Sequence, residues 1–449
     1  MSLRDQLLTA DTPAEIADVI DQYVRNEIVR IQTNPTTGAT ELLGPDGRAI
    51  KTQKVGNGVV VFGDSRARMS DPSVSDNDRG MWKWANILMG QRFNTLAVSG
   101  VSGDTAALML ARIEADVLDH EPDYVVVLVG INDISAGVAT ATIISNLQSI
   151  YSKINAIGAT VVACLEYPSS SAYSTTAKRE ALMQLNHAIL DYARTHSNVV
   201  VANLYDALID PTSATGAQKT GTLHDNIHPS VAGARLCATE ISNVMTTLCP
   251  AQRIFSTSKI DVVSATHQGG NLVLNGCMAG TAGTNTGTGM SGNVADSWFN
   301  FLESGTATSV SSKVARTDNY SGEWNRQTIA ATADNSIIRL RQTVTLPAQV
   351  AVGDTIEAYC ELALSSVVGV VDSVHFVIYL MDAGFTNTLA AWSIEPSGDP
   401  ATAFSGVLKI DPVVIPANTT QMFVMVRCQL DNGASCVVDV GRVEVRKVA

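Results

Sequence analysis

The sequence predicts an α/β domain on a five-stranded parallel sheet, followed by an antiparallel β-sandwich. Short apolar runs alternate with helical stretches through the middle of the chain, as in parallel sheets covered on both faces. The last part has period-two runs and no long helix. With 449 residues, the chain is too long for one ordinary core. We therefore expect three parts, over residues 1–55, 56–250 and 251–449.

The first part, 1–55, is expected to form a helix and a hairpin. Pro13 suits the first position of a helix. Apolar residues then recur at helical spacing: Ile16, Val19, Ile20, Tyr23, Val24 and Ile28. The run Gly44-Pro45-Asp46-Gly47 predicts a turn between two short strands. This part is too small for its own core, so we expect it to pack on the next domain or on a second copy of the chain.

The second part, 56–250, alternates strands with helices. The expected strands are Val59–Phe62, Phe93–Val98, Tyr124–Val129, Thr160–Leu165 and Val199–Ala202. The expected helices are Met81–Met89, Thr105–Val117, Thr140–Ile157, Thr176–Thr195 and Ser230–Leu248. In such sheets ligands bind at the carboxyl ends of the strands, so that edge is where chemistry is expected.

The third part, 251–449, changes character. The stretch 278–294 is rich in Gly, Thr, Ser and Asn and predicts a flexible loop. Beyond it, Ile338, Leu340, Val344 and Leu346 share one face of an expected strand, and the run Met422–Leu430 repeats this alternation. The runs His375–Met381 and Val437–Val445 add further strands. Together they predict an antiparallel sandwich of jelly-roll type.

Composition excludes some classes of protein. The net charge of -13, with no cluster of Lys and Arg, argues against nucleic-acid binding. No apolar run is long enough to span a bilayer. The run Met1-Ser2-Leu3-Arg4-Asp5 contains no apolar signal region, so we identify no secretory signal and leave the localisation open. The seven cysteines are scattered without a CxxC pair, so we expect small buried hydrophobes rather than a zinc site or disulfides.

Four short motifs fall at strand-to-helix turns on the expected ligand edge. They are Gly63-Asp64-Ser65, Ser102-Gly103-Asp104-Thr105, Gly130-Ile131-Asn132-Asp133 and Asp225-Asn226-Ile227-His228-Pro229. Each alone is usually a helix cap, a turn or a loop glycine. Four in order at one edge point instead to a catalytic site.

The chemistry of a nucleophilic serine suits these residue types. A serine hydroxyl needs an adjacent base, which His228 could supply to Ser65. Asp225, three residues before that histidine, could hold its tautomer. The backbone N–H groups of Ser65 and Gly103 and the side-chain amide of Asn132 could together form an oxyanion hole. Neither a cofactor nor a metal is required by this arrangement.

These motifs closely resemble the SGNH, or GDSL-like, hydrolase family, over about 195 residues and in the family's order. The four residues that name the family match Ser65, Gly103, Asn132 and His228, and its Asp-x-x-His element begins at Asp225. The resemblance implies a flavodoxin-like three-layer α/β/α fold and hydrolysis of an ester or thioester through an acyl-serine. Two departures stand out. Arg66 follows the serine where a small or apolar residue is frequent, and Val98-Ser99 replaces an Asn that often begins the second motif.

Other polar residues near the motifs have simpler interpretations. Asp64 and Asp104 are expected to cap or orient rather than catalyse. Asp206, near the end of the fifth strand, is a rival for the acid, but Asp225 has the better spacing. His224 and His228 are four apart and on a helix could bind a metal, but Pro229 disfavours helical geometry before it.

The third part carries the indication of substrate. The run Asn271-Leu272-Val273-Leu274-Asn275-Gly276 and the closing run Val438–Val445 resemble jelly-roll carbohydrate-binding modules. Trp298, Trp324 and Trp392 could stack on sugars, although tryptophans in sandwiches are more often core. An esterase joined to such a module suggests a carbohydrate O-acetyl esterase acting on an acetylated polysaccharide.

The leading helix and hairpin also look like phage tail-fibre or tailspike architecture, which implies a homotrimer acting on bacterial surface glycan. Three alternatives stay open: a lipase or thioesterase using the same residues, a noncatalytic glycan-binding adhesin, and a purely structural tail protein.

Overall fold

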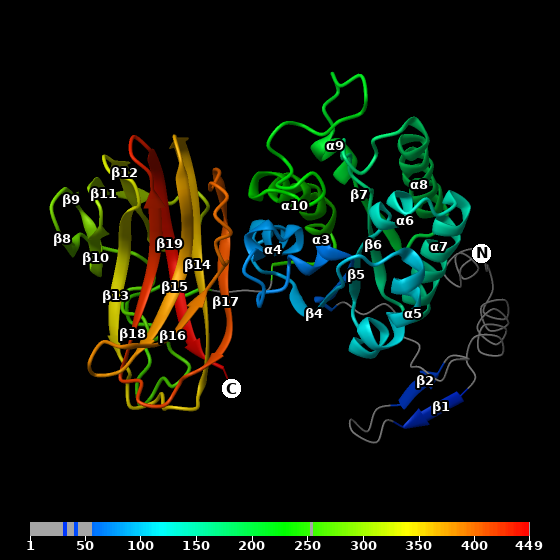
Figure 1. The fold of residues 1–449 in the computed structure, drawn as a ribbon. Helices are drawn as coiled ribbons and strands as arrows, with labels where there is room; N and C mark the ends of the chain where they lie inside the picture. Colours follow the sequence, from blue (N-terminus) through cyan, green and yellow to red (C-terminus); the bar gives the residue numbers. More distant parts are fainter. Residues whose placement is uncertain (1–29, 34–39, 44–55, 252–254, 449) are drawn as a thin grey trace.

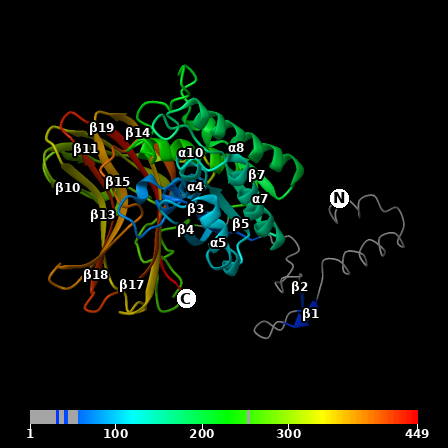
Figure 2. The same cartoon turned by 45° about the vertical axis from the view of Figure 1, so that its right-hand side comes forward.

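The computed structural model describes residues 30–33, 40–43, 56–251 and 255–448. The helix expected around Ile16–Ile28 and the turn expected at Gly44–Gly47 lie outside these residues. Within the first part, β1 (Arg30–Thr33) and β2 (Thr40–Leu43) pair as an antiparallel ribbon. Beyond it, an α/β domain and a β-rich domain lie side by side, with α4 facing β17 (Figures 1 and 2).

The α/β domain is built on five parallel strands. They are β3 (Gly58–Gly63), β4 (Asn94–Gly100), β5 (Tyr124–Leu128), β6 (Thr160–Cys164) and β7 (Val199–Ala202). Their spatial order is β4-β3-β5-β6-β7. The predicted flavodoxin-like sheet is confirmed. Its central strands β3 and β5 are buried along their whole length, which explains their continuous apolar sequence.

Helices cover both faces of this sheet. One face packs under α4 (Met81–Leu88) and α10 (Val231–Met245), and the other under α5 (Ala106–Asp116), α7 (Thr140–Ala156) and α8 (Thr176–Thr195). Shorter elements follow the strands: α3 (Ser65–Arg68), α6 (Ile131–Ser135), α9 (Leu204–Leu208) and the 3₁₀ turns η1 (Asn77–Arg79) and η2 (Leu118–His120). The five long helices were predicted from the sequence, and the short ones were not.

The β-rich domain consists of two six-stranded sheets, consistent with a β-sandwich. In order, the first contains β16 (Asn387–Trp392), β15 (Val371–Met381), β18 (Gln421–Leu430), β13 (Ser336–Thr345), β10 (Val294–Ser304) and β8 (Ala282–Thr286). The second contains β17 (Phe404–Val414), β14 (Thr355–Val368), β19 (Ser435–Lys447), β12 (Glu323–Ala331), β11 (Ala307–Ala315) and β9 (Met290–Gly292). The two alternating runs recognised in the sequence pair with each other, because Leu340 lies opposite Val426.

The loop expected over 278–294 is wrong in part, because β8 and β9 lie within it. Each is an edge strand that pairs in parallel, β8 with β10 and β9 with β11. The glycines that predicted a loop instead allow close backbone approach. At Gly292, with φ of +87°, a Cβ would lie 2.0 Å from the carbonyl oxygen of Ser311.

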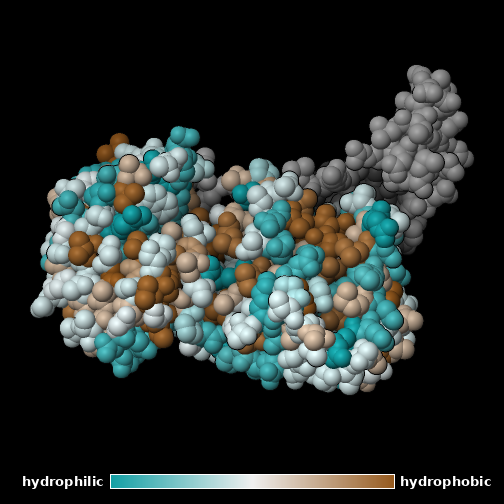
Figure 3. All heavy atoms as spheres, turned by 90° about the horizontal axis from the view of Figure 1, so that it is seen from above, coloured by the Kyte–Doolittle hydropathy of each residue, from teal (hydrophilic) through white to brown (hydrophobic). Residues whose placement is uncertain are grey.

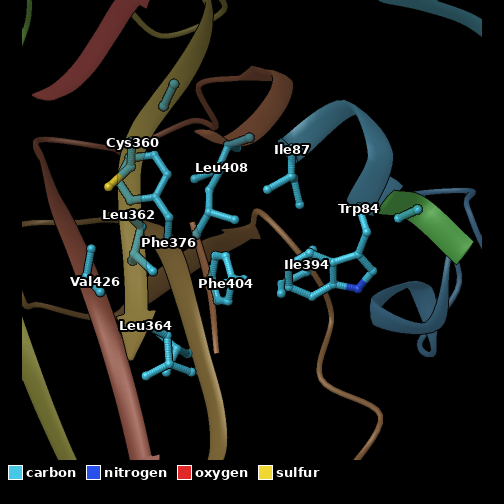
Figure 4. Close-up of a cluster of buried hydrophobic side chains, with 14 of the residues drawn as sticks. Trp84, Ile87, Cys360, Leu362, Leu364, Phe376, Ile394, Phe404, Leu408 and Val426 are labelled. Atoms are coloured by element: carbon cyan, nitrogen blue, oxygen red, sulfur yellow. The ribbon is translucent and has the colours of Figure 1, made fainter. Parts of the chain in front are cut away.

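All seven cysteines are buried, which confirms that prediction. Apolar side chains also join the two domains. Trp84 and Ile87 on α4 point toward Phe404 and Leu408 on β17 (Figure 4). The rings of Trp84 and Phe404 meet edge to face with centroids 5.0 Å apart.

Gly63 ends β3 and is the first residue of the predicted nucleophile motif. A Cβ there would lie 2.5 Å from the Leu128 carbonyl oxygen and 2.9 Å from the Ala67 Cβ, and the backbone carbonyl cannot move aside cheaply. We expect Gly63→Ala to lower the free energy of unfolding by about 1–3 kcal/mol through overpacking. Urea unfolding measures this, with Gly269→Ala as the matched control, because nothing lies within 4 Å of a Cβ there. Equal midpoints for the two variants would contradict the expectation.

Candidate active site

Ser65 begins α3 immediately after β3. Asp64 is the N-cap of this helix, and its Oδ1 accepts a hydrogen bond of 3.0 Å from the backbone N–H of Arg66. The cap fixes the sharp turn from strand to helix, which places the serine at the carboxyl edge of the sheet.

The structure brings Ser65, His228 and Asp225 together. His228 Nε2 lies 2.7 Å from Ser65 Oγ, and His228 Nδ1 lies 2.7 Å from Asp225 Oδ2. The other carboxylate oxygen of Asp225 accepts from the backbone N–H of His228 at 2.8 Å. One tight turn therefore sets both the backbone and the ring of the histidine against the same carboxylate.

Asp225 is held as an anion. Partial burial by itself raises the pKa of this carboxyl, but hydrogen bonds from the backbone and ring of His228 outweigh burial and leave the pKa below its ordinary value. An ionised Asp225 keeps a proton on His228 Nδ1, so Nε2 is free to accept one from Ser65.

The segment 222–230 forms a small hairpin, hereafter the histidine hairpin. Leu223 and Pro229 form an isolated bridge, and the His224 N–H donates to the His228 carbonyl at 2.8 Å. From the α/β domain, the Tyr167 hydroxyl donates to the Ile227 carbonyl at 2.7 Å. His224 and His228 therefore lie opposite each other in a hairpin. A metal-binding pair spaced four residues apart would instead need both histidines on one face of a helix. The ring of His224 lies instead 3.3 Å from Asp399.

The two remaining motif residues, Gly103 and Asn132, are connected through Asp104. Gly103 has φ of +86° and open space where a Cβ would be. The Asn132 side-chain amide donates to the Asp104 carbonyl at 2.9 Å, so it reaches the residue next to Gly103. An amide nitrogen carries two hydrogens, so this bond leaves Asn132 a second donor. Nearby, Asp133 is buried and accepts from the Ala106 N–H at 3.0 Å; desolvation raises its pKa to about 6.

The other acidic residues considered from the sequence bind elsewhere. Asp104 pairs with Arg112 at 2.6 Å, while the cap of α5 is Thr105. Asp206, the rival acid, accepts from the Asn203 side-chain amide at 2.8 Å. Asp225 is the carboxylate that contacts His228.

Arg66 is buried, so it forms no exposed wall of the site. Its guanidinium pairs with Asp64 at 2.7 Å and with Glu166, whose side chain is also fully buried, and it lies 4.9 Å above the ring of Tyr167. Sequence reasoning missed Glu166. The available signal was its position two residues after the end of β6, where a charged residue follows an apolar strand at the ligand edge.

The three tryptophans proposed as sugar platforms differ in position. Trp298 is core, with 1% of its surface exposed and its indole N–H donating to the Asn275 carbonyl at 3.3 Å. This burial excludes it as a platform. Trp324 and Trp392 are partly exposed; Arg316 covers the ring of Trp324 at 4.6 Å, and His375 meets the ring of Trp392 edge-on at 5.1 Å.

The described residues contain neither a metal-binding cluster nor a membrane-spanning helix. Within 56–251 and 255–448, together with β1 and β2, no group of three or more His, Cys, Asp or Glu side chains could hold a metal ion. Over the same part of the chain, no helix combines the length and apolar character needed to cross a membrane.

Residues 61–236 match the model of the GDSL-like Lipase/Acylhydrolase family. This match supports the family resemblance seen in the four motifs, and it covers the α/β domain alone. A curated relative is the uncharacterized lipoprotein YqeF of Bacillus subtilis (strain 168), with 35% identity over 77 residues. That alignment spans 17% of this chain and 31% of the relative, so about a third of the relative's length is matched.

Solved structures also align with this chain. A lipase/acylhydrolase from Enterococcus faecalis is 23% identical, covering 44% of this chain and 100% of its own, with a TM-score of 0.37. A GDSL-like lipase from Bacteroides thetaiotaomicron VPI-5482 is 19% identical, covering 44% and 91%, with a TM-score of 0.35. An acetyl-xylooligosaccharide esterase from Geobacillus Stearmophilus is 18% identical, covering 43% and 95%, with a TM-score of 0.36.

The buried ion cluster under the serine gives a stability prediction. Arg66→Ala would leave Asp64 and Glu166 buried without their counter-charge, so we expect a loss of about 3–5 kcal/mol in the free energy of unfolding. Guanidinium unfolding measures it. The matched control is Arg194→Ala, which breaks an exposed pair with Asp191 and should change stability little. Similar losses in the two variants would show that the buried carboxylates do not need Arg66.

Proposed function

We propose that this protein is a serine esterase that hydrolyses ester bonds through an acyl-serine intermediate. The observation that carries the proposal is the unbroken chain of contacts from Ser65 Oγ through the His228 ring to Asp225, with 2.7 Å at each step. A hydroxyl, a neutral imidazole and an ionised carboxylate in this order are what acyl transfer to serine requires.

In the first half-reaction, Ser65 Oγ attacks the ester carbonyl carbon while His228 Nε2 takes the hydroxyl proton. The carbonyl electron pair moves onto oxygen, giving a tetrahedral intermediate whose negative charge needs hydrogen-bond donors. We assign these donors to the backbone N–H groups of Ser65 and Gly103 and to the second amide hydrogen of Asn132. When the intermediate collapses, the bond to the alcohol breaks and the imidazolium protonates the departing alkoxide.

In the second half-reaction, water replaces the alcohol. His228 takes a proton from the water, whose oxygen attacks the acyl-serine carbonyl. Collapse of this second tetrahedral intermediate breaks the bond to Ser65, and the imidazolium returns the proton to the serine oxygen. Asp225 stabilises the positive imidazolium in both halves without itself taking the proton.

The substrate we propose is an O-acetylated polysaccharide, and two features favour it. Val101 follows β4 at the same edge of the sheet at which Ser65 follows β3. It donates its N–H to the Gly63 carbonyl at 3.1 Å and is 43% exposed, so it offers a small apolar surface at this edge. The face of the α/β domain seen from above also carries apolar residues among hydrophilic ones (Figure 3). The adjoining sandwich resembles carbohydrate-binding modules, which suits a polymeric sugar chain beside a small acyl site.

The role of the site predicts a specific pattern among variants. We expect Ser65→Ala and His228→Ala each to remove most of the turnover, and the double variant to lose little more, because the residues act as a unit. Asp225→Asn should cost less than loss of Ser65 or His228, because both of those groups remain although the histidine tautomer is no longer held. Asn132→Ala should cost about 2.7–4 kcal/mol in transition-state stabilisation if it donates to the oxyanion. Steady-state hydrolysis of p-nitrophenyl acetate measures all five variants, and full activity in Ser65→Ala or His228→Ala would refute the assignment.

Substrate preference separates this proposal from its alternatives. We expect kcat/KM to fall steeply from acetate to longer nitrophenyl esters, and acetate to be released from acetylated glycans by the parent but not by Ser65→Ala. A preference for long acyl chains or thioesters would instead indicate a lipase or thioesterase. Glycan binding that survives Ser65→Ala, with no hydrolysis by the parent, would indicate an adhesin.

A further inference from the structure

The loop between β16 and β17, residues 393–403, extends from the sandwich onto the α/β domain. Its backbone N–H at Glu395 donates to the side chain of Asn77 at 2.8 Å, and that at Ser397 donates to the carboxylate of Asp78 at 2.8 Å. Its Thr402 carbonyl accepts from Arg235 at 2.6 Å. This interdomain loop is therefore anchored on the α/β domain at several points.

One side chain of this loop, Asp399, contacts the neighbourhood of the catalytic histidine. Its carboxylate forms a two-point contact with Arg79, with Nε to Oδ2 at 2.8 Å and Nη2 to Oδ1 at 3.0 Å. Oδ2 also accepts from the backbone N–H of Val231 at 3.3 Å, and Oδ1 lies 3.3 Å from Nδ1 of His224. The carboxylate is 17% exposed, so these contacts are shielded from solvent.

Two of the three groups that Asp399 contacts, His224 and Val231, flank the residues proposed for catalysis. His224 directly precedes Asp225 and donates its backbone N–H to the His228 carbonyl at 2.8 Å. Val231 begins α10, three residues after that histidine. Tyr167 holds the same hairpin from within the α/β domain through the Ile227 carbonyl. The histidine hairpin is thus held by its own domain on one side and by the sandwich on the other.

The charge of Asp399 suits this role. Burial raises the pKa of its carboxyl, but the hydrogen bonds and charge of Arg79 outweigh burial, together with the N–H of Val231, and leave the pKa below its ordinary value. The group is therefore an anion at neutral pH. Arg79 supplies the fixed geometry, since a planar guanidinium binds a carboxylate at two points.

We propose that Asp399 is a positioning residue, supplied by the sandwich domain, that holds the histidine hairpin so that His228 faces Ser65. The proposal rests on the esterase function proposed above and adds a second role for the sandwich, which is to complete the active site. Small misplacements of a catalytic group cost much rate, about a hundredfold for 1 Å. Asp399 touches neither the serine nor the imidazole of His228, so it acts through His224 and the start of α10.

The test is the full chain with Asp399→Asn. Asparagine keeps the shape but loses the charge that binds Arg79 and His224. We expect kcat for p-nitrophenyl acetate to fall about tenfold, with KM changed less than about twofold. This loss is smaller than the roughly hundredfold loss for a 1 Å displacement, because we expect His228 to shift by less than that. The rate at which a fluorophosphonate labels Ser65 should fall in parallel, because it depends on activation of the serine by His228.

The matched control is Gln91→Asn, which breaks another contact between the domains. Gln91 donates its side-chain amide to the Val407 carbonyl at 2.8 Å, has no contact with the hairpin, and has φ of +57°, which asparagine tolerates. We expect this variant to keep the parent's kcat and labelling rate. Equal losses in the two variants would overturn the proposal, because they would show that Asp399 merely holds the domains together. Unchanged kcat in Asp399→Asn would also overturn it.

A second variant guards against misfolding of the first. His224→Gln removes one partner of Asp399 from the hairpin side. We expect it to lower kcat by itself, and the double variant to lose less than the product of the two single effects, because both act through one contact. Fully independent effects would count against the proposal. Ser65→Ala in the same assay distinguishes failure of the esterase proposal from failure of the positioning proposal. If Ser65→Ala retains activity, the esterase proposal fails. If Ser65→Ala is inactive but Asp399→Asn retains full activity, only the positioning role of Asp399 fails.

Discussion

The contact between His228 Nε2 and Ser65 Oγ joins residues 163 positions apart in the chain, at 2.7 Å. A hydrogen bond tolerates little error in distance or angle, so both partners need independent supports. Ser65 has the end of β3 and the Asp64 cap beneath it. His228 has a hairpin closed by its own backbone bonds and held through Tyr167 and, from the other domain, Asp399. The parallel sheet of the α/β domain meets this requirement, because parallel strands bring their carboxyl ends to one edge.

The residues packed beneath Ser65 form a buried cluster of charged side chains. Arg66, Asp64 and Glu166 are fully buried, and removing three charges from water costs free energy that their attraction repays only in good geometry. Such a cluster contributes less to stability than apolar packing of the same volume would. Its effect is to fix the cap of α3, because Asp64 binds both the helix N-terminus and the guanidinium. The same side chain thereby links the core to the orientation of Ser65.

Much of this protein was determined by local sequence. Continuous apolar runs are what strands buried on both faces require, so the five parallel strands and the long helices between them could be predicted. The four motifs could be placed at one edge because every parallel strand ends there. Asp225 and His228 could be paired because three residues close one turn. Edge strands β8 and β9 could not be predicted, since a glycine-rich stretch has the same composition whether it pairs or not.

Only the tertiary structure decided which distant groups meet. Nothing local indicates that Arg66 turns inward to Glu166, 100 positions away, or that Trp298 belongs to the core. Asp399 lies in an ordinary Ser-Gly-Asp-Pro turn, and its contact with Arg79 spans 320 positions and two domains. The physical reason is that hydrophobic period and turn chemistry act over a few residues, whereas the pairing of charges and the docking of domains depend on how whole surfaces fit. The sequence therefore specified the parts of the site, and the packing of the two domains decided how they are held.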